Sequence, residues 1–147
     1  MAEARGRADV AVFAWISAIE RLATQRVERA LPAGLSATGL EVINRLAVSP
    51  GPSSPQALAH GLLLSKSAMT HTLQRLERQA LVTISVDPAD GRRKRVALTT
   101  AGVAAQRAAA ATLRPRIEAV RAALGPQAFE AALPFLERLG AWLAENP

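Results

Sequence analysis

The sequence predicts a mainly α-helical protein that contains one small β-hairpin. Alanine accounts for 32 of the 147 residues, aromatic residues make up only 3%, and there is no tyrosine. Alanine is the best helix former, whereas strands favour aromatic and β-branched residues. A clear alternation of apolar and polar residues, typical of a half-buried strand, is confined to the region between residues 82 and 98. Half of the residues are apolar, which is enough for the core of one typical domain.

The composition excludes several classes of protein. There is no cysteine, so disulfides, thiolate metal sites and thiol redox sensing are excluded. No stretch of about 18 uncharged apolar residues is present, so we expect neither a membrane-spanning helix nor a membrane partner. The N-terminal segment carries charges where a signal peptide needs an apolar core, so we expect a cytoplasmic protein; these charged residues are Glu3, Arg5, Arg7 and Asp9.

The positive charge of the chain is concentrated in one segment. The formal net charge is +6. Residues 66–95 hold seven basic and three acidic side chains, a net charge of +4, whereas the segments before and after each have a net charge of +1. We therefore expect a polyanionic partner that binds at this segment.

Four helices are predicted before residue 80. Apolar residues recur at helical spacing from Asp9 to about Leu31, where a Leu-Pro-Ala-Gly cluster ends the pattern. The other three helices begin after serines that are candidate N-caps: a short helix after Ser36, one from Pro55 to about Gly61 after Ser54, and one after Ser65 that continues through Gln79.

A hairpin follows these helices. Its strands are expected at Val82–Val86 and Lys94–Leu98, because apolar and polar residues alternate there. Asp87–Gly91, which lies between the two strands, is rich in turn-forming residues. We expect no other β structure.

Two further helices complete the predicted fold. Thr99 or Thr100 caps a long alanine-rich helix that ends at Gly125–Pro126, and the last helix follows. Pro115 is expected to kink or divide the first of these helices. Pro134 is a second anomaly, inside the last helix.

A helix-turn-helix followed directly by a hairpin is a winged helix-turn-helix, and its second helix suits the major groove of DNA. On the helix after Ser65, apolar Met69, Leu73 and Leu76 predict a buried face. The opposite face carries hydrogen-bonding groups, and the hairpin carries four consecutive basic residues. The candidate DNA-binding residues are Ser54, Ser65, Lys66, Ser67, Thr70, His71, Gln74, Arg75, Arg92, Arg93, Lys94 and Arg95.

The chain resembles the MarR family of bacterial transcriptional regulators over residues 36–102, and its flanking helices occur in the family's order. The resemblance rests on Gln56–Ala59, Ser65–Thr70, Leu73–Glu77, Leu81–Val82, Asp90–Arg93 and Leu98–Gly102, where the last two segments carry the family's Asp-x-Arg and Leu-Thr-x-x-Gly steps. Leu63 and Ala80 stand in turns where members of the family usually carry glycine. The resemblance implies an obligate homodimer that reads a pseudo-palindromic operator and commonly responds to a small-molecule effector.

The resemblance divides the chain into an N-terminal dimerisation helix (1–34), a winged helix-turn-helix module (35–100) and C-terminal dimerisation helices (101–147). We predict that apolar stripes on the terminal helices form the dimer interface, with Trp142 beside it, and packing within one chain is the alternative; the residues are Val12, Ile16, Ile19, Phe129, Leu133, Leu136 and Leu143. Phe13 and Trp15 are candidates for an effector pocket, and packing between subunits is the alternative for both.

We expect neither a cofactor, nor a metal ion, nor an enzyme activity. The only histidines are His60 and His71, which without cysteine make a poor ligand set, and no triad, paired-carboxylate or phosphate-loop motif is present. His71 could also be a solvated helix residue that contacts no base, and the basic hairpin could also be a solvated tip that contacts no nucleic acid. The predicted function is that of a sequence-specific regulator binding double-stranded DNA, a ligand-responsive homodimeric repressor. The alternatives are a winged-helix protein-interaction module and a non-specific architectural DNA-binding protein.

Overall fold

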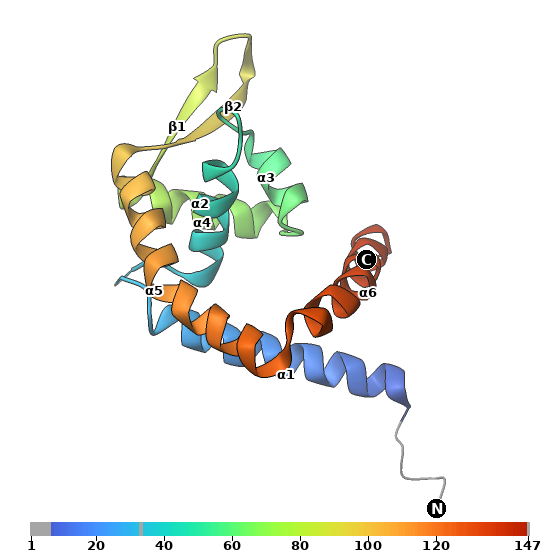
Figure 1. Ribbon diagram of the computed structural model, residues 1–147. Helices are drawn as coiled ribbons and strands as arrows, with labels where there is room; N and C mark the ends of the chain where they lie inside the picture. The colour runs from blue at the N-terminus through green and yellow to red at the C-terminus, as the bar shows by residue number, and fades with distance from the viewer. Residues whose placement is uncertain (1–6, 33, 147) are drawn as a thin grey trace, which may run out of the picture.

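The computed structural model describes residues 7–32 and 34–146 and confirms the predicted fold class (Figure 1). Three helices and a hairpin follow the first helix, and two long helices end the chain. The elements are α1 (Ala8–Glu28), α2 (Ala37–Ala47), α3 (Pro55–Gly61), α4 (Lys66–Arg78), β1 (Val82–Asp87), β2 (Asp90–Leu98), α5 (Thr100–Leu124) and α6 (Pro126–Glu145).

Four of the helices begin at the side-chain caps that the sequence predicts. In each case the hydroxyl oxygen of the cap accepts a hydrogen bond from the backbone N–H three residues later, which satisfies one of the unpaired donors of the first turn. The caps are Ser36 for α2, Ser54 for α3, Ser65 for α4 and Thr99 for α5, at 2.9–3.2 Å.

The core lies between α2, α3, α4 and the base of the hairpin. The largest fully buried side chains are Val42, Ile43, Leu58, Met69, Leu76, Val82 and Val96. On α4, the buried positions include Met69, Leu73 and Leu76, as the helical spacing predicts. The winged module therefore contains most of the hydrophobic core of the described chain.

The hairpin is longer than predicted. Strand β2 begins at Asp90 rather than Lys94, and Asp87 pairs with Asp90, so that only Pro88 and Ala89 lie between the strands. The carboxylate oxygens of Asp87 and Asp90 accept hydrogen bonds from the backbone two residues later, at 2.9 and 3.0 Å, which stabilises this tight end. The hairpin is also not the only β structure, because Ser53 forms an isolated antiparallel bridge with Val96.

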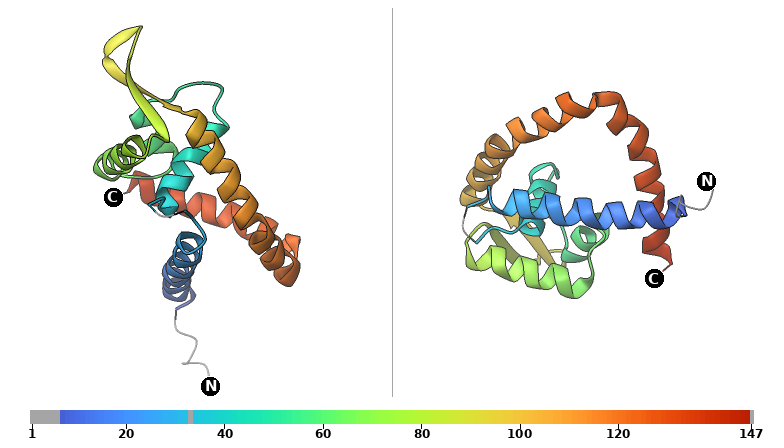
Figure 2. Two further views of the ribbon diagram at one scale, coloured as in Figure 1. Left: turned by 90° about the vertical axis from the view of Figure 1, so that its left-hand side faces the viewer. Right: turned by 90° about the horizontal axis from the view of Figure 1, so that it is seen from below.

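The terminal helices extend away from the winged module, and α5 and α6 form an arch with α1 across its opening (Figure 2). Neither α1 nor α6 contains a buried residue, and α5 contains only Gly102 and Ala109. Contrary to one of the two expected outcomes, Pro115 does not divide α5. The first helix ends at Glu28 rather than near Leu31, whose side chain turns into the core.

Within residues 7–32 and 34–146, no helix is long and apolar enough to cross a membrane.

Candidate nucleic-acid interface

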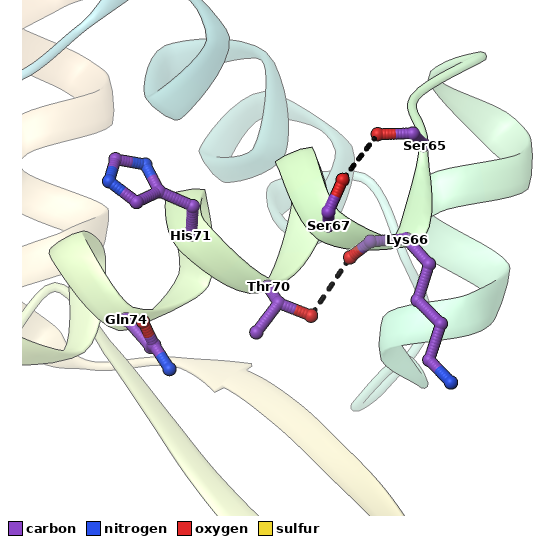
Figure 3. Close-up of a pocket in the computed structure, with 6 residues that line it drawn as sticks. All are labelled: Ser65, Lys66, Ser67, Thr70, His71 and Gln74. Carbon is purple, nitrogen blue, oxygen red and sulfur yellow. Dashed lines mark hydrogen bonds between the residues drawn. The ribbon is translucent and has the colours of Figure 1, made fainter.

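The outer face of α4 gathers six of the candidate DNA-binding residues. They line an open depression of about 710 Å³, and all six side chains are exposed (Figure 3). The residues are Ser65, Lys66, Ser67, Thr70, His71 and Gln74. The opposite face of α4 is buried in the core, so the helix is held by one side and presents the other.

The six side chains of this face differ in what they already bind. The Thr70 hydroxyl donates to the carbonyl oxygen of Lys66 at 2.8 Å, and the Ser65 and Ser67 hydroxyls share a hydrogen bond of 3.1 Å. By contrast, the side chains of Lys66, His71 and Gln74 make no hydrogen bond or ion pair with any residue that the structure describes. Donors and acceptors on this face therefore remain available to a ligand.

The structure places Ser54 and Arg75 apart from this face. Ser54 is half-buried as the N-cap of α3. Arg75 is half-buried, and its Nη2 donates to the carbonyl oxygen of Gly34 at 3.2 Å, beside Gln79, whose Nε2 donates to the same oxygen at 2.6 Å. Arg75 thus fastens the end of α4 to the segment before α2. No local sequence pattern indicates this contact, because 41 residues separate its partners.

The hairpin, or wing, presents the remaining four candidates. Arg92, Arg93 and Lys94 are exposed, and Arg95 is half-buried. Arg93 forms an ion pair with Asp90 at 3.1 Å, which holds its guanidinium near the tip. Arg92 and Arg93 lie where the strand pairing is irregular, next to the regular pairs formed by Lys94 and Arg95. These four side chains give the wing a basic end. The two aspartates nearby, Asp87 and Asp90, already accept hydrogen bonds from the backbone of the turn.

Both ends of α4 are fixed by turns that require positive φ. Leu63, before α4, has a φ of 54°, and Ala80, after it, has a φ of 56°. Each is followed by an N–H that bonds five residues back, from Leu64 to Ala59 and from Leu81 to Leu76. This is the Schellman pattern that ends helices and favours glycine at the left-handed position. The chain keeps these turns although the two residues carry side chains.

The predicted dimer residues lie on the terminal helices, mostly exposed. Val12 and Ile16 are half-buried, and the other five are exposed. Sequence reasoning placed Trp142 beside this stripe but missed Phe135, a further exposed aromatic residue on α6. Phe135 lies seven residues before Trp142, and this helical spacing is the signal that could have identified it.

Phe13 and Trp15 are both exposed on α1. Residues two apart on a helix point about 200° apart, so the two side chains leave opposite sides of α1 and do not line one pocket within a subunit. Among the described residues, no three His, Asp or Glu side chains gather as metal ligands would.

Known proteins with the same fold support these observations. A model of the MarR family matches residues 33–93. A probable transcriptional regulator from Pseudomonas aeruginosa is 30% identical, with 84% of this chain and 96% of that chain covered and a TM-score of 0.70. The M. tuberculosis transcriptional regulator MOSR, solved in complex with DNA, is 27% identical, with 93% and 98% covered and a TM-score of 0.77.

A third solved structure shares the fold at lower identity. The Streptomyces coelicolor regulator PcaV, solved with its natural ligand, is 19% identical, with 86% and 89% covered and a TM-score of 0.78. No curated protein sequence matches the chain. The family model and the similarity to the Pseudomonas protein, together with the winged module described above, show that the chain belongs to the MarR family.

Proposed function

We propose that this protein is a transcriptional regulator that binds double-stranded DNA sequence-specifically through α4 and the wing. The outer face of α4 is the observation that carries the proposal. It is exposed, it contains no carboxylate, and three of its polar side chains have no partner in the described chain. A single helix fits the major groove, where each base pair presents a distinct pattern of donors and acceptors.

The wing supports the same function. Arg92, Arg93, Lys94 and Arg95 give it a charge that suits phosphates or a narrow minor groove. Arg75 remains a candidate for a phosphate contact, since its one hydrogen bond, from Nη2 to the Gly34 oxygen, uses only one of the five N–H donors of the guanidinium. Ser54 remains a candidate for a phosphate contact, since its hydroxyl accepts a bond from Ala57 and keeps its own proton.

The regulator is proposed to act as a homodimer. Both α1 and α6 carry exposed large apolar side chains, whose exposed fractions range from 45% to 67%. Neither helix buries a residue within its own chain, which leaves apolar faces on both for a second copy. The proposed interface comprises Val12, Ile16, Ile19, Phe129, Leu133, Leu136 and Leu143.

A small-molecule effector and a repressor role complete the proposal. PcaV was solved with its natural ligand and MOSR with DNA, and we extend both properties to this chain. Because Phe13 and Trp15 leave opposite sides of α1, an effector pocket within one subunit can include only one of them. Because a regulator of this kind acts on the chromosome, we propose that the protein works in the bacterial cytoplasm.

Selection of duplexes from a random-sequence pool tests the proposed function. The full chain is expected to enrich one pseudo-palindromic sequence, which it then binds in preference to a scrambled duplex of the same composition. DNA that is bound without an enriched sequence would favour an architectural protein. A pool that is not retained at low salt would favour a protein-interaction module and would contradict DNA binding.

A further inference from the structure

Thr70 is the residue on the outer face of α4 whose hydroxyl proton is already used within the helix. Its Oγ1 donates to the carbonyl oxygen of Lys66 at 2.8 Å. A hydroxyl has one proton to donate, so this bond leaves none for a base. In Figure 3 the oxygen of Thr70 points along the helix toward Lys66, and its methyl carbon points away from the ribbon. Thr70 therefore has no donor for a ligand, and the group that it directs outward from the helix is the methyl group.

The neighbours of Thr70 make this methyl group distinctive. Lys66 and Gln74 lie one turn before and one turn after it on the same side of α4, and both present polar groups. Thr70 also lies in the N-terminal half of α4, the part of a recognition helix that contacts base edges. The face thus places one small apolar group between two hydrogen-bonding groups, at the position suited to reading a base.

We propose that Thr70 determines specificity for a thymine through contact between its methyl group and the 5-methyl group of the base. Thymine alone among the four standard bases presents a methyl group in the major groove, and a threonine methyl group is a suitable partner for it. The proposal rests on the proposed function, because it requires α4 to lie in the groove. In this proposal the methyl group of Thr70 recognises the base, and its hydroxyl does not donate a hydrogen bond to the base.

The test uses the full chain and the duplex that it enriches from a random pool. Each thymine is replaced in turn by deoxyuridine, which lacks only the 5-methyl group, at the equivalent positions of both half-sites. At one thymine position the affinity is expected to fall about fourfold per half-site, the change expected for one buried methyl group. The other thymines serve as internal controls.

Two conservative variants separate the methyl group from the hydroxyl. Thr70→Val keeps a methyl group and is expected to retain the deoxyuridine penalty, whereas Thr70→Ser keeps only the hydroxyl and is expected to lose it. Circular dichroism and thermal unfolding verify that both variants fold. A scan without any penalty, or a penalty lost in Thr70→Val and kept in Thr70→Ser, would overturn this inference and leave DNA binding intact. Failure to enrich any duplex would instead overturn the proposed function and this inference together.

Discussion

Gly102 packs so closely against the carbonyl oxygen of Leu81 that a Cβ atom at residue 102 would collide with that oxygen. Thr99, which caps α5, lies at the same place: its N–H donates to the Leu81 oxygen at 3.1 Å, and its hydroxyl donates to the Ala80 oxygen at 2.6 Å. The Leu-Thr-x-x-Gly motif thus fastens the start of α5 to the turn that ends α4. A rigid joint results between the helix proposed to read DNA and a helix proposed to form the dimer.

Gly102→Ala should therefore destabilise the protein. The added methyl group meets backbone, which yields less readily than a side chain. We therefore expect the free energy of unfolding to fall by about 1–3 kcal/mol or more. Chemical denaturation followed by circular dichroism measures the change. Gly91→Ala is the matched control, since a Cβ atom there meets no atom within 4 Å. Equal stabilities of the two variants would contradict the described packing.

Ala80→Gly should stabilise the protein. Ala80 has a φ of 56°, a region that costs a residue with a Cβ atom about 1–2 kcal/mol. The greater entropy of glycine in the unfolded chain offsets about 0.4–1 kcal/mol of this gain, which leaves a net gain of roughly 0.5–1 kcal/mol. The control is Ala104→Gly on the exposed side of α5, where the same change should cost about 1 kcal/mol. A loss of stability in both variants would show that residue 80 is unstrained.

Lys66 should lower the stability of the free protein and raise its affinity for DNA. It occupies the first position of α4, where the helix dipole disfavours a cation, and no acidic residue lies in that turn. Lys66→Gln is expected to raise the free energy of unfolding by about 0.3–1 kcal/mol. The same variant should bind the enriched duplex less tightly, with a salt dependence shallower by about one unit of slope.

The opposite end of α4 provides the control for Lys66. Arg78 lies in the last turn, where a cation is favourable, so Arg78→Gln should lower the stability. If Lys66→Gln leaves both the affinity and its salt slope unchanged, then Lys66 does not contact a phosphate.

Leu136→Glu should dissociate the dimer. Leu136 is 48% exposed in one chain and lies on the apolar stripe of α6 that we assign to the interface. A carboxylate buried there without a partner would cost several kcal/mol, and the symmetry of a dimer would impose the cost twice. Sedimentation velocity is expected to report monomers for this variant. Val48→Glu places the same charge on an exposed apolar position of the winged module and should remain dimeric; a dimeric Leu136→Glu would remove Leu136 from the interface.

The local features of this fold could be predicted from the sequence, whereas the contacts between distant segments could not. The serine caps and the polar face of α4 follow from residue type and helical spacing, because both depend on neighbours within one or two turns. The role of Arg75 depends on Gly34, which packing brings near it. The length of β2 does not follow from the alternation, because two aspartate side chains stabilise a tight turn where the predicted strands leave a connection of seven residues, 87–93. The contacts of these residues with DNA and with a second subunit stay predictions.

The central claim is that a rigid homodimer reads two half-sites, one with each α4. Its most direct test inserts about five base pairs, half of a helical turn, between the half-sites of the enriched duplex and measures the affinity by titration. The insertion moves one half-site to the opposite side of the DNA, so we expect binding to fall to the level of a duplex with a single half-site. Equal affinity for the original and the lengthened duplex would contradict the rigid dimer.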